Sequence, residues 1–183
     1  MPIQTLLTVE EFEQLPKDGY ANYELVDGEL VKTSSGTFTH NRMRDKMVGR
    51  FDRFLSNNPL GAAVGEVDVR TGPRSVRKPD VSFWRREKLA QFDRNKVPVT
   101  VPPDIAAEVI SATELATDVN DKVLEYLDAG VCEVWLVFMT SGEIHVRRSS
   151  NSIRVWRAGE ELQSEMLPGF SLPLEELFRE ASL

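Results

Sequence analysis

Residues 105–110 read Ile105-Ala106-Ala107-Glu108-Val109-Ile110, an almost continuous apolar run that only Glu108 interrupts. Such a run is typical of a strand that other elements cover on both faces. An ionised carboxylate away from water is costly unless it is paired or binds a cation. The stretch therefore predicts a central strand of a sheet and a functional role for Glu108.

A second acid stands at the head of another short apolar run, in Pro79-Asp80 followed by Val81 and Phe83. Hard oxygen ligands of this kind suit Mg²⁺, which takes one or two carboxylates together with water and substrate phosphate. We expect Asp80 and Glu108 to bind such a metal at strand level. Asp104 is a weaker candidate, because four strand residues separate it from Glu108 by roughly 13 Å, and it is expected at the strand entrance.

Lys122 is the third candidate, on a helix expected from about Thr117 to Ala129 and ended by Gly130. Helical spacing places Lys122 beside the inward-facing Val119 and Tyr126. Two interpretations have equal weight. The ammonium extends to solvent and pairs with Asp118, or it reaches the strand ends and meets the water or phosphate that the carboxylates handle.

The other elements follow from local patterns. The sequence predicts a capped helix from Thr8 to about Leu15, a hairpin around Asp27-Gly28, a helix from about Thr39 to Asn57, strands near Val64–Val69, Val81–Phe83 and Val131–Phe138, and a hairpin over Glu143–Arg148 and Ile153–Trp156. This mixture indicates an α/β or α+β fold. With 183 residues, 41% of them hydrophobic, we expect one domain over residues 1–183.

Charge is unevenly distributed along the chain. The net charge of −7 argues against a nucleic-acid partner, but residues 70–96 hold nine basic residues against three acids, a net charge of +6. The segment after Gly159 is acidic instead. The helix over Thr39–Asn57 carries a stripe formed by Arg42, Lys46, Arg50 and Arg53. That stripe is more often a solvated face than a surface that follows phosphates, by about two to one.

Several classes of protein are disfavoured. No apolar stretch reaches the length of a membrane span, and Met1–Gln14 lacks the features of a signal peptide, so we expect no membrane and a cytoplasmic location. The sequence contains no nucleophile elbow and no glycine-rich phosphate loop. Cys132 is expected as a small core residue and His145 as a structural histidine.

Taken as a set, these motifs resemble the Uma family, a bacterial family of restriction-endonuclease-like proteins within the PD-(D/E)XK nuclease superfamily. The resemblance runs from about Thr8 to Arg148. It rests on residues 23–30 (YELVDGEL), Pro79-Asp80, Glu108-Val109-Ile110, Lys122 with Tyr126, and residues 130–135 (GVCEVW).

The resemblance implies a restriction-endonuclease-like fold, a mixed central sheet flanked by helices, with an N-terminal hairpin extension. It also implies a Mg²⁺-dependent site, for which Mn²⁺ is a possible substitute, DNA as substrate, and a homodimer. Asp80 and Glu108 match the two acids of the superfamily motif. The usual lysine two residues after the glutamate is replaced here by Ile110, and Lys122 is similar to a migrated replacement.

The family resemblance also suggests further site residues, and the sequence around them gives these assignments less support. Glu24 is assigned to the catalytic set, because the family tends to keep an acid there, although it could simply pair with a base. His40 could equally be a helix-start residue. We assign contact with nucleic acid to six residues: His40, Arg42, Lys46, Arg74, Arg77 and Lys78.

Two other functions stay open. A catalytically silent member could bind nucleic acid or oligomerise, since a fold does not fix a function. A metal-dependent hydrolase of a small phosphorylated substrate could use the same carboxylates. The basic segment over residues 70–96 favours a polymer substrate.

Overall fold

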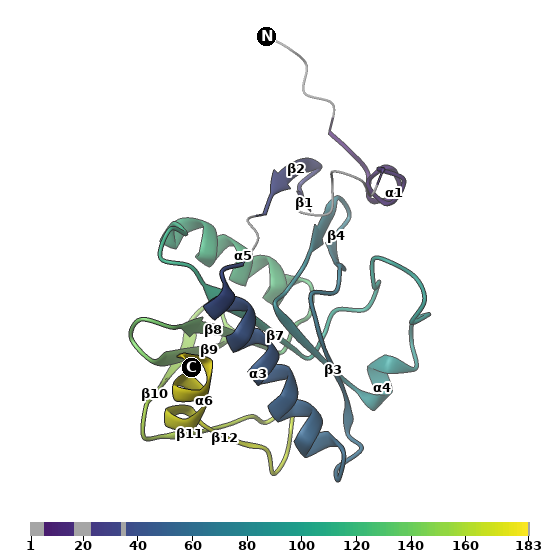
Figure 1. Cartoon of the computed structure of the whole chain (residues 1–183). Coiled ribbons are helices and arrows are strands. Elements are labelled where there is room, and N and C mark those ends of the chain that lie inside the picture. The colour runs from purple at the N-terminus through teal and green to yellow at the C-terminus, as the bar shows by residue number, and fades with distance from the viewer. Residues whose placement is uncertain (1–5, 17–22, 34–35, 183) are drawn as a thin grey trace.

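The computed structural model describes residues 6–16, 23–33 and 36–182. The sequence expectation for Met1–Gln14 therefore falls partly on residues outside this description, namely Met1–Thr5. A six-stranded sheet in the order β10-β9-β8-β7-β6-β3 forms the centre (Figure 1). Its strands are β3 (Gly61–Gly65), β6 (Val81–Arg85), β7 (Ile105–Ile110), β8 (Glu133–Phe138), β9 (Glu143–Ser149) and β10 (Ser152–Arg157).

Strand β7 lies inside this sheet, as its apolar sequence predicts. It runs parallel to β8 and antiparallel to β6. Residues 105–109 are all buried, which confirms the prediction of a strand covered on both faces. A carboxylate on this strand is therefore held between layers rather than at the surface.

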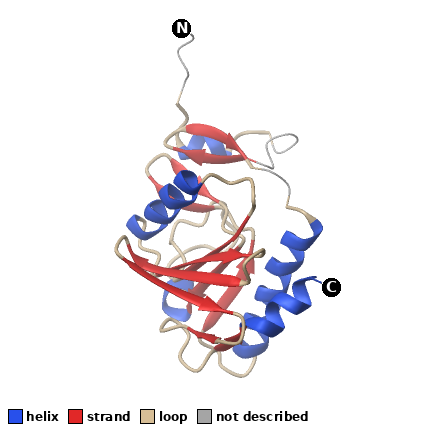
Figure 2. Ribbon diagram, turned by 90° about the vertical axis from the view of Figure 1, so that its left-hand side faces the viewer, coloured by secondary structure: helices blue, strands red, loops and turns tan. Residues whose placement is uncertain are grey.

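Helices cover both faces of the sheet (Figure 2). Helix α5 (Ala116–Asp128) packs on the face formed by Ala106, Val134 and Leu136. Helices α3 (Phe38–Leu55) and α6 (Leu174–Ser182) pack on the opposite face against a larger core. The fold is thus a mixed α+β sheet flanked by helices, as predicted.

The N-terminal part adds a smaller sheet in the order β2-β1-β5-β4. Its strands are β1 (Tyr23–Val26), β2 (Glu29–Lys32), β4 (Val69–Gly72) and β5 (Ser75–Arg77), and helix α1 (Val9–Glu13) precedes them. The hairpin turn has φ of 50° at Asp27 and 90° at Gly28, as the Asp-Gly signal predicts. A Cβ at Gly28 would also lie 2.9 Å from that of Leu6.

Some elements were not predicted. These are α4 (Arg86–Leu89), β5, the β11–β12 pair (Glu161–Gln163 and Ser171–Pro173) and α6. Helix α6 buries Leu174, Leu177 and Ala181, so the acidic C-terminal segment also contributes to the core. Cys132 is half-buried near Asp104, so its prediction as a core residue was wrong. In the described part of the chain, no helix is long and apolar enough to cross a membrane.

Candidate active site

The carboxylates of Asp80 and Glu108 come from neighbouring strands. Val81 pairs with Ala107 across β6 and β7, and one further step of this antiparallel register sets Asp80 opposite Glu108. Asp80 Oδ2 accepts a hydrogen bond of 2.7 Å from the backbone N–H of Val109. Both residues are buried, with 9% and 7% of their surface exposed. Asp80 directly precedes β6 and Glu108 lies within β7, so the two acids are far apart in the sequence. The register of the two strands sets them opposite each other.

Helix α5 supplies the partners of Glu108. The Tyr126 hydroxyl donates a hydrogen bond of 2.6 Å to Glu108 Oε1, and Lys122 Nζ lies 3.5 Å from Glu108 Oε2. Burial raises the pKa of Glu108 to about 8, although the charge of Lys122 acts in the opposite direction. The Glu108 carboxylate in turn raises the pKa of Lys122, so the ammonium stays charged at neutral pH.

Glu24 brings the small sheet into the same site. Its Oε2 lies 4.0 Å from Lys122 Nζ and accepts a hydrogen bond of 3.1 Å from Arg77 Nη1. Its Oε1 accepts another of 2.9 Å from the backbone N–H of Lys78. The structure thus places Glu24 beside Lys122.

Arg77 lies inside the molecule rather than on a surface that could contact phosphate. Its Nε donates a hydrogen bond of 2.8 Å to Glu125 Oε2, and Glu125 also accepts one from Thr71. Only 9% of the Arg77 side chain is exposed. Contact of Arg77 with nucleic acid stays a prediction, and in this structure two carboxylates engage its buried guanidinium. Arg77 holds Glu24 and helix α5 in place.

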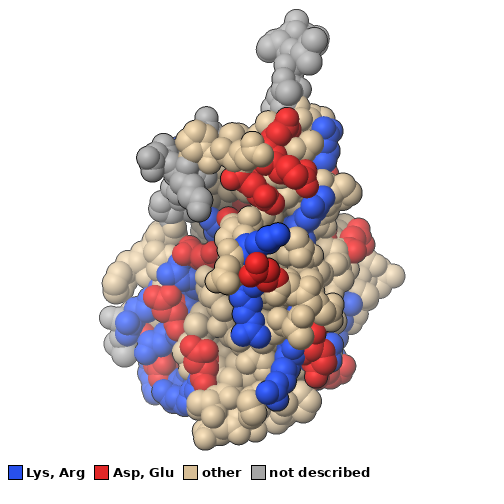
Figure 3. Space-filling view, turned by 90° about the vertical axis from the view of Figure 1, so that its right-hand side faces the viewer, with Lys and Arg blue, Asp and Glu red and all other residues tan. Residues whose placement is uncertain are grey.

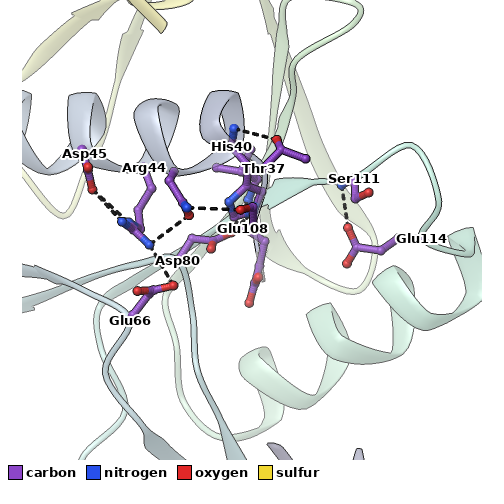
Figure 4. Close-up of polar contacts among 12 residues, drawn as sticks. Thr37, His40, Arg44, Asp45, Glu66, Asp80, Glu108, Ser111 and Glu114 are labelled. Atoms are coloured by element: carbon purple, nitrogen blue, oxygen red, sulfur yellow. Dashed lines mark hydrogen bonds and ion pairs between the residues drawn. The ribbon is translucent and has the colours of Figure 1, made fainter. Parts of the chain in front are cut away.

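His40 approaches Asp80 from the first turn of α3 (Figure 4). The side chain of Thr37 accepts the His40 backbone N–H and caps this helix. His40 Nε2 lies 3.3 Å from Asp80 Oδ2, and this hydrogen bond raises the pKa of His40. The structure therefore places His40 at the acid pair, in addition to its helix-start position.

The donor set fits a hard divalent cation. Sheet register sets Asp80 and Glu108 opposite each other, and two carboxylates are within the number that Mg²⁺ commonly takes from a protein. Within the described residues, no group of three or more His, Cys, Asp and Glu side chains is arranged around one point. The remaining coordination positions would then fall to water and substrate, as expected for Mg²⁺.

The other predicted basic contacts are dispersed. Arg42 Nε donates to the backbone oxygen of Glu180 over 3.2 Å, and Lys46 Nζ lies 3.3 Å from Glu180 Oε2. Lys78 Nζ lies 3.2 Å from Asp68 Oδ1. Arg74 is in the turn between β4 and β5, where its carbonyl accepts the N–H of Gly28. The described contacts of Arg42, Lys46 and Arg74 do not include Asp80 or Glu108, and the backbone N–H of Lys78 donates to Glu24.

The basic segment over residues 70–96 is largely neutralised by neighbouring acids. Five of its nine basic residues form ion pairs, namely Arg70, Arg77, Lys78, Arg85 and Lys88. Arg85 and Lys88 share Asp104, which is fully buried at the start of β7, as predicted for a strand entrance. Figure 3 shows positive and negative side chains interspersed on one face of the molecule. The local net charge of +6 therefore does not form a continuous basic face there.

Sequence reasoning did not assign Tyr126 or Glu125 to the site. Both lie on the same side of α5 as Lys122, Glu125 three and Tyr126 four residues later, which is the spacing of helical neighbours. Once Lys122 is assigned to the site, this helical spacing indicates that Tyr126 lies there too. The contact of Glu125 with Arg77 depends on the packing of α5 against β5 and has no local signal.

Comparisons with known proteins agree with this architecture. The sequence model of the family Uma2, described as "Putative restriction endonuclease", matches residues 9–175. No curated protein matches the sequence. A solved structure described as "a putative nuclease belonging to DUF820 from Anabaena variabilis ATCC 29413" superposes with a TM-score of 0.82 at 18% identity, over 96% of this chain and 99% of that one. At this identity the likeness shows a shared fold.

Proposed function

The chain belongs to the Uma2 family of restriction-endonuclease-like proteins, and from this membership we propose that it is a divalent-metal-dependent nuclease that hydrolyses phosphodiester bonds in DNA. One observation carries the proposal. The register of β6 and β7 sets Asp80 opposite Glu108, and the ammonium of Lys122 lies 3.5 Å from Glu108. Phosphodiester hydrolysis needs this combination of metal ligands and a fixed positive charge.

Each group has a distinct role in the proposal. Asp80 and Glu108 would hold Mg²⁺, or Mn²⁺ in its place, and the bound ion would neutralise phosphate charge and lower the pKa of a water molecule. Lys122 stays protonated because Glu108 raises its pKa, so it stabilises negative charge on the phosphate and does not act as a general base. Glu24 keeps Lys122 at the acid pair, and His40 orients the Asp80 carboxylate.

Cleavage of plasmid and single-stranded DNA tests the proposal. Natural protein with Mg²⁺ or Mn²⁺ is expected to cut, and Asp80→Asn and Lys122→Met are expected to lose at least about a hundredfold in rate, the scale of removing one preorganised electrostatic partner. Asp121→Asn and Lys96→Met are matched controls, because both positions are exposed. Equal rates for Lys122→Met and Lys96→Met would contradict the role of Lys122.

A small phosphorylated substrate is the second candidate. The pairing of five basic residues with acids favours it, because a polymer substrate benefits from an open basic track. Salt dependence separates the two functions. Binding of a polymer through several phosphates weakens steeply as salt rises, whereas turnover of a small phosphodiester changes little.

The oligomeric state and domain organisation complete the proposal. Residues 1–183 are proposed to form one domain that acts as a homodimer, which the family resemblance implies. Sedimentation equilibrium of the natural protein tests the dimer, and a monomer mass at all concentrations would exclude it. A single cooperative unfolding transition is expected for one domain.

A further inference from the structure

A cavity lined in part by Ile110, two residues after Glu108 on the same strand, has no role in the function proposed above. It has a volume of about 670 Å³ and opens between the N-terminal half of α5 and strands β8 to β10. We call it the β8–β9 pocket; Ile110, Ser111, Asn120, Phe138, His145 and Arg147 line it. This volume lies within the range of small-molecule sites in proteins.

The pocket continues the candidate active site along the same strand and helix. Ile110 follows Glu108 by two residues on one face of β7, which is roughly 7 Å along the strand. Figure 4 shows Ser111 and Glu114 on the segment that leaves the Glu108 strand, where Glu114 Oε2 accepts the N–H of Ser111 over 2.6 Å. A nucleic-acid strand with a phosphate at Glu108 would therefore reach the pocket within about one nucleotide.

The lining combines two aromatic rings, tilted by 48° to each other, with polar groups. The rings of Phe138 and His145 lie side by side, with their centroids 4.5 Å apart. Arg147 Nη2 donates to the backbone oxygen of Ser150 over 3.0 Å, but its buried Nε has no hydrogen-bond partner among the described residues. A buried donor without a partner costs free energy that a ligand acceptor can recover.

A nucleobase has the matching chemistry, because its faces are apolar and its edge carries hydrogen-bond acceptors. Aromatic side chains and guanidinium groups are common partners of unstacked bases. A base inside a duplex cannot reach such a pocket without leaving the stack. We propose that the β8–β9 pocket holds one unpaired base of the substrate strand beside the cleaved phosphodiester. This rests on the proposed nuclease function and specifies its substrate as DNA that is single-stranded or locally open.

Equilibrium binding in EDTA tests the pocket without requiring cleavage. The probe is a short fluorescein-labelled single-stranded DNA, compared with a strand of equal length that carries abasic sites throughout its centre. Natural protein is expected to bind the base-containing strand about tenfold more tightly, within the range of base stacking on aromatic side chains. Equal affinity for the two strands would overturn the proposal.

Filling the pocket gives an independent test. Ala116 is exposed and lines the pocket, so Ala116→Trp is expected to fill it without disturbing the core, and Thr117→Trp on the same turn is the matched control. Ala116→Trp should abolish the preference for base-containing strands, and Thr117→Trp should keep it. An Ala116→Trp variant that keeps the preference, or that changes only the sedimentation mass, would overturn the proposal and, in the second case, indicate a second copy of the chain as occupant.

The two hypotheses fail in different ways. Cleavage of DNA by the natural protein without any preference for base-containing strands would retain the nuclease and exclude the base site. Base-dependent binding without cleavage under any metal would retain the base site and exclude the nuclease.

Discussion

The hydroxyl of Tyr126 donates a hydrogen bond of 2.6 Å to Glu108 Oε1, and both side chains are buried between α5 and β7. This bond favours the ionised carboxylate, whereas burial favours the protonated one and raises the pKa of Glu108 to about 8. Tyr126 therefore partly opposes the effect of burial on the pKa of Glu108.

Tyr126→Phe is expected to raise the pKa of Glu108 further and to lower the affinity for metal, because the substitution removes a donor to the charged form. The lost hydrogen bond should cost about 1 kcal/mol of unfolding free energy. Chemical denaturation and Mn²⁺ titration measure the two effects. In a double-mutant cycle with Glu108→Gln, additive costs would show that the two residues are not coupled.

Metal affinity should depend on pH through Glu108. A raised carboxyl pKa means that the folded protein retains a proton until about pH 8, and a cation must displace that proton to bind. Affinity for Mn²⁺ is therefore expected to fall as pH decreases below about 8 and to level off above it. Calorimetry in buffers of different ionisation enthalpy should detect one proton released per ion, and an affinity that does not change with pH would exclude Glu108 as a ligand.

Arg77→Met should destabilise the protein strongly. It removes the cation between Glu24 and Glu125 and leaves two carboxylates without their buried partner, for which a loss of about 3–5 kcal/mol is expected. Arg94→Met, at an exposed position, should stay within about 0.5 kcal/mol. Urea unfolding compares them, and similar midpoints would show that Arg77 does not hold the smaller sheet and α5 together.

The contact between α3 and α6 should weaken in acid. Burial acts to raise the pKa of Glu180, but hydrogen bonds from Arg50 and Lys46 outweigh it and lower the pKa overall. A lowered folded-state pKa stabilises the protein above the unfolded-state value, and this contribution is lost as pH falls through the folded-state pKa. Glu180→Gln should therefore cost at most about 1 kcal/mol at neutral pH and nothing in acid.

Glu175→Gln is the matched control for this prediction, because Glu175 is exposed on the same helix. Thermal unfolding at neutral and acidic pH compares both variants with the natural protein. A difference between the two variants that persists in acid would show that Glu180 acts through packing rather than charge.

Local patterns predicted most elements around the site. The capping box at Thr8, the Asp27-Gly28 turn and the apolar spacing of α3 and α5 are properties of neighbouring residues, and each predicted element is present. Helix α6 was missed because its acidic residues were considered only as a charge pattern, although Leu174, Leu177 and Ala181 recur at helical spacing. Strand β5 was missed because it has only three residues.

The sequence alone determined the central strand with its acid, the second acid at Pro79-Asp80 and the place of Lys122 beside Tyr126 on its helix, because strand and helix periodicity decide which side chains share a face. Only the tertiary structure decided that Lys122 lies within 4.0 Å of both Glu24 and Glu108, because helix packing brings α5 to the two strands. Sheet register in turn sets Asp80 opposite Glu108. The tertiary structure also placed Arg77 inside and paired the basic segment with acids. Local sequence records the charge of a side chain, but the position of its partner depends on the fold.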